Sequence, residues 1–239
     1  MAADGWTSPV VGVLGGMGPA ATVAFLDQLV RLTDAHTDQG HIDTIVTQHG
    51  SIPPRSDFIL QPEAAADPTP ALVADARRLH SAGADMLVIP CNTACHYLPA
   101  IAAAVPIPCV SIVDVTARRA VTTGHVIAVL ATEGTIAAGL FQQAIQAAGG
   151  QSRVPPPRAQ HDINDVIEQV KAGRPADLGK LNACIVESLT AGADAVIFGC
   201  TELSVVYDRS GYEARAQVID SLRSLVLHTI TACGRGVRA

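Results

Sequence analysis

Cys91 and Cys200 end two copies of the same short sequence. Residues 82–91 read AGADMLVIPC, and residues 191–200 read AGADAVIFGC. An internal repeat reveals architecture, and this one places two thiols at equivalent points of two similar units. Two thiols that face one pocket can move a proton from one face of a carbon atom to the other, because one acts as the base and the other as the acid. The alternative is that both are small buried hydrophobic residues, as free cysteines usually are.

The residues before each cysteine predict a helix followed by a buried strand. The runs 86–89 and 195–198 are short and rich in apolar residues, which is typical of strands in parallel sheets. Gly83 and Gly192 stand where the C-cap of a preceding helix is expected. Each cysteine would then lie between a strand's carboxyl end and a helix N-terminus, where open α/β sheets bind ligands. We expect the helix dipole there to lower the thiol pKa below its usual value of about 8.5.

A second pair of similar segments extends the repeat. Residues 13–19 (VLGGMGP) and 129–135 (VLATEGT) each end a predicted strand and run through a glycine into a helix start. The chain therefore resembles two related α/β halves rather than one run of βαβ units. The glycine loop lacks the G-x-G-x-x-G spacing, and no acidic residue ends a later strand at the distance that a dinucleotide site needs. We therefore do not expect a nucleotide site.

The remaining apolar runs give the expected elements and lobes. Strands are predicted near residues 10–14, 43–48, 86–89, 109–112, 126–130, 153–154, 195–198 and 217–219, with helices between them. We expect a first α/β lobe over residues 1–115 and a second over 116–215. The segment 216–239 is predicted to cross back and complete the first lobe. The proline-rich segment 50–70 is predicted to be a functional loop.

The composition suits a parallel α/β sheet and argues against two classes of partner. Hydrophobic residues make up 49% of the 239 residues but aromatic residues only 3%, so Ala, Val, Ile and Leu must form the core. The net charge of −6 argues against nucleic acid or an anionic membrane as a partner. The first residues, MAADGWTSP, lack the apolar core of a signal peptide, and no apolar stretch is long enough to span a bilayer. Six cysteines without paired spacing predict reduced thiols and a cytoplasmic location.

Six motifs follow one another along the chain: GVLGGMGPAAT, SIPPRS, PCNTA, LATEGT, VKAG and GCTELS. Together they resemble the ordered motif set of the aspartate/glutamate racemase family, most closely its aspartate racemase branch. The resemblance covers nearly the whole chain. It implies a cofactor-independent racemase with two Rossmann-like lobes, an active site in the cleft between them and a homodimeric assembly. It also implies that Cys91 and Cys200 are the catalytic pair.

Neither a pyridoxal cofactor nor a metal ion is expected. Pyridoxal enzymes hold their cofactor on a lysine, but this chain has only Lys171 and Lys180, neither of them in a recognisable cofactor motif. Cys91, Cys95 and His96 could suggest a metal site, but no matching pair of ligands occurs elsewhere in the sequence.

Two cations are candidates for binding an acidic amino acid. Arg55, in the sequence Ile-Pro-Pro-Arg, suits bidentate binding of the aspartate side-chain carboxylate, and Lys171 can approach from the other half. The resemblance implies that both bind substrate, whereas the alternative for each is a solvated surface charge. The residues that we expect to bind substrate are Met17, Gly18, Gln48, Arg55, Asn92, Thr93, Thr132, Lys171, Thr201 and Glu202.

The polar residues after each cysteine have two possible roles. Backbone N–H groups at the helix starts would face the substrate α-carboxylate, and Asn92, Thr93 and Thr201 would add side-chain donors. Helix capping alone is the alternative. Glu202 either orients Cys200 or stabilises the helix N-terminus electrostatically.

Other functions stay open beside the racemisation of aspartate. Residues 48–50 (QHG) stand where the family usually has an Asn pair and Pro, so glutamate or a broader range of amino acids is an alternative substrate. Related two-lobed enzymes isomerise maleate or decarboxylate malonates, although the decarboxylases use a single cysteine. A non-catalytic amino-acid sensor would retain Arg55 and the glycine loop but would need neither thiol.

Overall fold

Two parallel four-stranded sheets form the framework of this computed structural model, which describes residues 8–210, 212 and 215–238. The first sheet contains β1 (Val11–Gly15), β2 (Thr44–Gln48), β3 (Met86–Val88) and β4 (Cys109–Val110), in the order β2-β1-β3-β4. The second contains β5 (Val126–Leu130), β6 (Gln151–Arg153), β7 (Ala195–Phe198) and β8 (Val218–Asp220), in the order β6-β5-β7-β8. The two sheets share one topology, which confirms the predicted pair of related α/β lobes.

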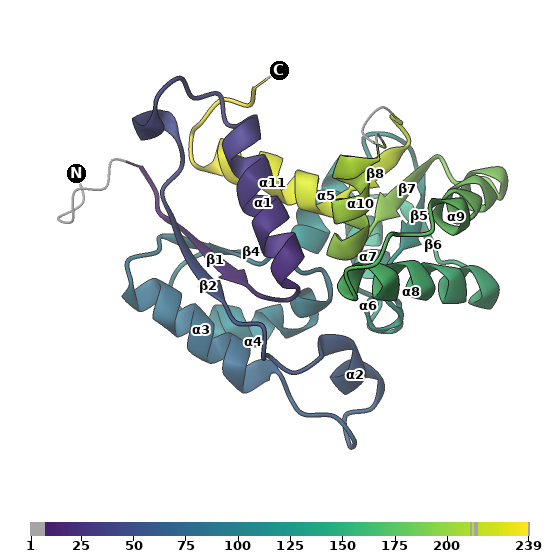
Figure 1. Ribbon diagram of the computed structural model, residues 1–239, viewed down its shortest axis with the longest axis horizontal. Helices are drawn as coiled ribbons and strands as arrows, with labels where there is room; N and C mark the ends of the chain where they lie inside the picture. The colour runs from purple at the N-terminus through teal and green to yellow at the C-terminus, as the bar shows by residue number, and fades with distance from the viewer. Residues whose placement is uncertain (1–7, 211, 213–214, 239) are drawn as a thin grey trace.

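Helices flank both sheets (Figure 1). The helices of the first half are α1 (Pro19–Leu32), α2 (Arg55–Leu60), α3 (Thr69–Ser81), α4 (Leu98–Ala103) and α5 (Ile112–Ala120), with short 3-10 helices η1 (Asp38–Gly40) and η2 (Thr93–Tyr97). Those of the second half are α6 (Glu133–Ala137), α7 (Leu140–Ala147), α8 (Pro157–Lys171), α9 (Leu178–Thr190), α10 (Thr201–Arg209) and α11 (Ser221–Ala232). In Figure 1, α1 and α3 lie on either side of β1, and both pack on it.

The repeated sequence forms the helix and strand that were predicted for it. β3 and β7 are buried at every position, as expected for apolar strands between helical layers. Before them, Gly83 and Gly192 follow the ends of α3 and α9 with φ angles of +101° and +93°. Residues with a side chain rarely adopt such angles, so glycine ends each helix and turns the chain towards its strand.

The last helix of each half packs on the other half. α5 packs on α7, β7 and β8 of the second lobe, and α11 packs on α1 of the first lobe as well as on α5. In Figure 1, α11 runs beside α1 between the two sheets. The lobes are therefore joined by exchanged helices as well as by the connecting chain.

This exchange corrects the prediction for the C-terminal segment. β8 does not complete the first lobe, because it pairs with β7 in the second sheet, with Phe198 opposite Asp220. Only α11 reaches the first lobe. A strand of three residues is too short for its hydrophobic pattern to indicate which sheet it joins. The expected boundary at residue 115 falls within α5, and residues 1–7 and 239 of the predicted lobes lie outside the described residues.

One apolar core spans both lobes. It contains Phe25 of α1, Ile112 of α5, Phe141 of α7, Ile197 of β7 and Leu225 of α11, all buried. A continuous core of this kind fixes the two lobes relative to each other, because close-packed interiors resist displacement. Within the described residues, no helix is both long and apolar enough to cross a membrane.

Candidate active site

A small cavity lies between the lobes at the carboxyl ends of both sheets. Its volume is about 70 Å³, well below the roughly 300–1,000 Å³ of pockets for drug-sized ligands. The residues that line it are Met17, Pro54, Arg55, Ser56, Asp57, Cys91, Asn92, Thr93, Thr132, Lys171, Cys200, Thr201 and Glu202. The cavity thus joins both repeated cysteines with two cations, in a space suited to a small polar metabolite.

The two cysteines occupy equivalent places in the two sheets. Cys91 follows β3 and precedes η2, whereas Cys200 follows β7 and is the N-cap residue of α10. Their exposed fractions are 6% and 5%. The predicted position at a strand's carboxyl end is confirmed for both, but the helix after Cys91 is a short 3-10 helix rather than an α-helix. The site is therefore similar but not identical on its two sides.

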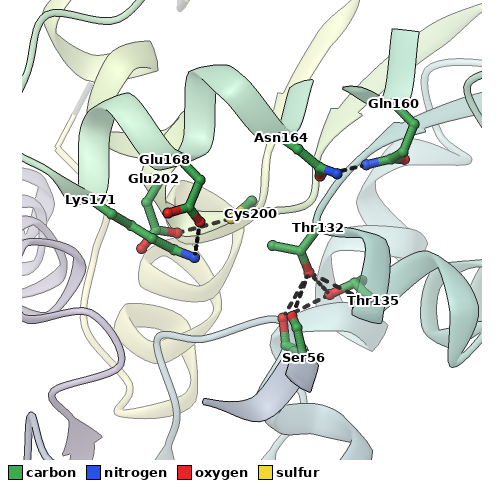
Figure 2. Close-up of polar contacts among 10 residues, drawn as sticks. Ser56, Thr132, Thr135, Gln160, Asn164, Glu168, Lys171, Cys200 and Glu202 are labelled. Carbon is green, nitrogen blue, oxygen red and sulfur yellow. Dashed lines mark hydrogen bonds and ion pairs between the residues drawn. The ribbon is translucent and has the colours of Figure 1, made fainter. Parts of the chain in front are cut away.

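A carboxylate lies against one of the two thiols. The Sγ atom of Cys200 donates a hydrogen bond of 2.9 Å to Oε2 of Glu202, in the first turn of α10 (Figure 2). Burial, then the charge of Glu202 and this hydrogen bond, raise the pKa of the Cys200 thiol well above its usual value. The backbone N–H of Glu202 and the nearby Lys171 have the opposite but smaller effect. The prediction of a lowered thiol pKa was therefore wrong for Cys200.

Lys171 approaches this cysteine from the end of α8. Its Nζ atom lies 2.8 Å from Oε1 of Glu168, and Figure 2 shows both side chains beside Cys200 and Glu202. Burial lowers the pKa of Lys171, but the hydrogen bond to Glu168 and the negative charges of Glu168 and Glu202 raise it. The ammonium group thus stays charged at the edge of the cavity.

Arg55 is held in the cavity wall by the proline-rich loop. It is the first residue of α2, and its Nη1 atom donates to the carbonyl oxygens of Ile52 (3.2 Å) and Pro53 (3.0 Å). The hydroxyl of Tyr97 donates to the backbone carbonyl of Arg55 at 3.0 Å. The Nε atom of Arg55 is buried, and within the described structure it has no hydrogen-bond partner. The guanidinium is therefore held in place through Nη1, and its Nε–H group remains available to bind a ligand.

Hydroxyl groups from both lobes meet at the same cavity. Thr93 Oγ1 lies 3.2 Å from Thr132 Oγ1 and 2.8 Å from Thr135 Oγ1. Ser56 Oγ donates to Thr132 Oγ1 at 3.4 Å, and Figure 2 shows Ser56 facing Thr132 and Thr135. A Cβ atom on Gly134 would lie 2.7 Å from Ser56, so glycine permits α2 to approach α6 this closely. The segment that carries Arg55 is thus packed against the second lobe.

Nearly all the predicted substrate-binding residues line the cavity, with two exceptions. Gln48 is the exposed last residue of β2 and does not line it. Gly18 is not part of the lining either, but a Cβ atom on it would lie 3.4 Å from Glu202 Oε1. Ser56 and Asp57 also line the cavity and were not among the predicted residues, although both directly follow Arg55 in the sequence. In the part of the chain described, no three His, Cys, Asp or Glu side chains are grouped to hold a metal ion.

The sequence matches a known enzyme family. The family model described as Asp/Glu/Hydantoin racemase matches residues 14–229. The chain belongs to this family. Over 229 residues it is 26% identical to the broad specificity amino-acid racemase RacX of Bacillus subtilis (strain 168), a match that covers 93% of this chain and 97% of RacX. Over 128 residues it is 30% identical to a glutamate racemase of Cupriavidus pinatubonensis, which covers 53% of this chain and 47% of that protein.

Solved racemase structures share the fold. The Picrophilus torridus aspartate racemase superposes with a TM-score of 0.80 at 25% sequence identity, over 96% of each chain. A glutamate racemase from Thermus thermophilus has a TM-score of 0.57 at 18% identity, over 94% of this chain and 80% of that one, and it shows the fold alone. The protein is thus an amino-acid racemase with two α/β lobes, and independence from pyridoxal phosphate fits its family.

Proposed function

We propose that this racemase interconverts L- and D-aspartate by a two-base mechanism in which Cys91 and Cys200 exchange a proton with opposite faces of Cα. The observation that carries the proposal is that both buried thiols line one small cavity, at equivalent ends of β3 and β7. Inversion of a carbon requires a base on one face and an acid on the other. A pair of cysteines can supply both.

The contact between Cys200 and Glu202 favours one starting state. Because burial and Glu202 raise the pKa of Cys200, this thiol keeps its proton in the unliganded cavity and is the acid. Cys91 as a thiolate takes the Cα proton, and the Cys200 proton is delivered to the opposite face of Cα. The products are the inverted amino acid, a Cys91 thiol and a Cys200 thiolate. This state catalyses the reverse reaction.

The chain must also stabilise negative charge at the substrate carboxylate and Cα. The N-terminus of α10 presents backbone N–H groups beside Cys200, and such groups bind anions. Thr201 lies there with 2% exposure and lines the cavity, so it can add a hydroxyl donor. Preorganised donors in a cavity closed to water stabilise developing charge strongly.

Arg55 and Lys171 support an acidic side chain on the substrate. Both line the cavity, and Arg55 has a buried Nε donor without a partner. A side-chain carboxylate would provide that partner and form a charge-assisted hydrogen bond. Because the cavity is small, it favours the shorter side chain of aspartate over that of glutamate.

A broad-specificity amino-acid racemase is the second candidate. The support for it is the match to RacX, which covers nearly the whole of both chains. Because Lys171 already forms an ion pair with Glu168, part of the positive charge in the cavity is neutralised. Such a site could accept neutral side chains.

A homodimer in the cytoplasm, as the family resemblance implies, is also part of our proposal. Light scattering of the purified protein would test its assembly.

Chiral chromatography of four substrates separates these candidates. The purified enzyme is incubated with L-aspartate, L-glutamate, L-alanine and L-serine without added cofactor, and kcat/KM is measured for each. We expect aspartate to have the highest value. A preference for alanine or serine would instead support broad specificity, and the absence of any D-product with these or other amino acids would support a sensor.

A further inference from the structure

A buried hydrogen bond joins the two lobes at the residue that follows Cys91. The Nδ2 atom of Asn92, next to Cys91, donates to the hydroxyl of Ser221 at 2.9 Å. The two residues have exposed fractions of 2% and 0%, so water does not compete for this bond. The two are 129 positions apart in sequence. The bond is thus a tertiary contact between the lobes.

The topology relates this bond to both cysteines. Asn92 directly follows Cys91 in the first lobe. Ser221 directly follows β8, which pairs with β7, and β7 leads to Cys200. The bond between Asn92 and Ser221 therefore links the segment that carries Cys91 to the end of β8, the strand that pairs with the one leading to Cys200.

Among the described residues, an apolar side chain occupies the position of the first lobe that is equivalent to Ser221. Ser111 and Asp220 are the N-cap residues of the equivalent helices α5 and α11, so the repeat makes Ile112 the counterpart of Ser221. Ile112 is fully buried in the apolar core. Because the fold accepts an apolar residue at this point of one half, a hydroxyl at the same point of the other half is not a requirement of folding.

We propose that Ser221 is a positioning residue which, through Asn92, fixes the separation of the two thiols. This role rests on the proposed two-base mechanism, because only that mechanism requires both thiols to be aligned on one carbon atom. Proton transfer requires close and well-aligned partners, and a misplacement of about 1 Å can cost two orders of magnitude in rate. Loss of the Ser221 hydroxyl leaves the Asn92 amide buried with one donor unpaired and frees it to shift. The effect should therefore fall on kcat rather than on KM.

The test compares Ser221→Ala with Ser224→Ala. Ser224 lies on the same helix and is buried to 4% exposure, but its hydroxyl donates to the backbone carbonyl of Asp220 and does not reach Asn92. Per folded enzyme, we expect Ser221→Ala to lower kcat for aspartate roughly tenfold in both directions, with KM changed by less than about threefold. Ser224→Ala should retain the parental kcat, and Ser221→Thr, which keeps the hydroxyl, should recover most of it.

A double-mutant cycle shows whether Ser221 acts through Asn92. The variant with both Asn92→Ala and Ser221→Ala should be no slower than Asn92→Ala alone. Additive losses, or equal kinetics for Ser221→Ala and Ser224→Ala, would overturn the positioning role while leaving the two-base mechanism in place. A parent enzyme that racemises no amino acid would overturn the proposed function, and this role with it.

Discussion

The thiol of Cys200 donates a hydrogen bond of 2.9 Å to the carboxylate of Glu202, two residues further along the chain. The carboxylate therefore stabilises the protonated thiol and opposes the thiolate. The helix dipole acts in the other direction, and it contributes up to about 2 kcal/mol at a partly buried terminus. Burial and the adjacent negative charge outweigh it and favour the protonated thiol, which is the state that the proposed mechanism requires of the acid.

Replacing Glu202 by Gln should make Cys200 more reactive. Gln removes the negative charge that raises the pKa of Cys200, so more thiolate forms at a given pH. At pH 7.5 we expect alkylation of Cys200 by iodoacetamide to accelerate several-fold, because the thiolate is the reactive form. Peptide mass spectrometry of the alkylated protein measures the rate at Cys200 itself.

The matched control is Glu63→Gln, which removes the same charge from an exposed position. It should leave the alkylation rate of Cys200 unchanged. An unaltered rate in Glu202→Gln would show that Glu202 does not control this thiol.

The repeated sequence was sufficient to predict the strands and the positions of the two cysteines. A run such as Ala195–Phe198, between a helix-ending glycine and a helix start, specifies its local structure by itself. The sequence could not predict which sheet β8 joins, or that Asn92 contacts Ser221, because both features depend on tertiary contacts. The Cys200 pKa was missed for the same reason: the dipole follows from the local sequence, but the extent of burial does not.

Each thiol should be indispensable for inversion. Cys91→Ala and Cys200→Ala should each abolish net racemisation and keep the fold, because a site with one base cannot reprotonate the far face of Cα. Ser at either position should also fail, since a hydroxyl ionises far less readily than a thiol. Chiral chromatography measures the reaction, and circular dichroism verifies the fold. Turnover near the parental rate in either Ala variant would rule out the two-base mechanism.

The charge of Arg55 should select acidic substrates. Arg55→Met leaves the substrate side-chain carboxylate in the cavity without its partner, which costs about 2–5 kcal/mol for an interaction of this kind. We expect kcat/KM for aspartate to fall by at least about thirtyfold, while any neutral amino acid that is accepted changes little. Arg77→Met, at an exposed position of α3, is the control and should match the parent. Equal losses for aspartate and alanine would show that Arg55 does not select the substrate.

The buried Asp220 carboxyl should make stability depend on pH. Burial raises its pKa to about 6, above the usual value of about 3.9 in an unfolded chain. The folded protein therefore retains this proton between about pH 4 and 6, where the unfolded chain loses it, so the stabilisation present at low pH is lost as pH rises. Relative to Asp220→Asn, the parent should lose about 2 kcal/mol in unfolding free energy from pH 4 to pH 7. Urea unfolding at both pH values measures this, and a constant difference between the two proteins would contradict it.

A two-thiol racemase removes a proton from one face of Cα and delivers another to the opposite face, so the product should gain hydrogen from the solvent. L-aspartate is incubated with the enzyme in deuterium oxide, and both enantiomers are separated and analysed by mass spectrometry early in the reaction. We predict that D-aspartate carries one deuterium at Cα, because the proton that it gains comes from a second thiol that exchanges with solvent. The remaining L-aspartate should be almost unlabelled at that stage. D-aspartate that retained the original hydrogen, or labelled L-aspartate without any D-aspartate, would contradict the two-thiol mechanism.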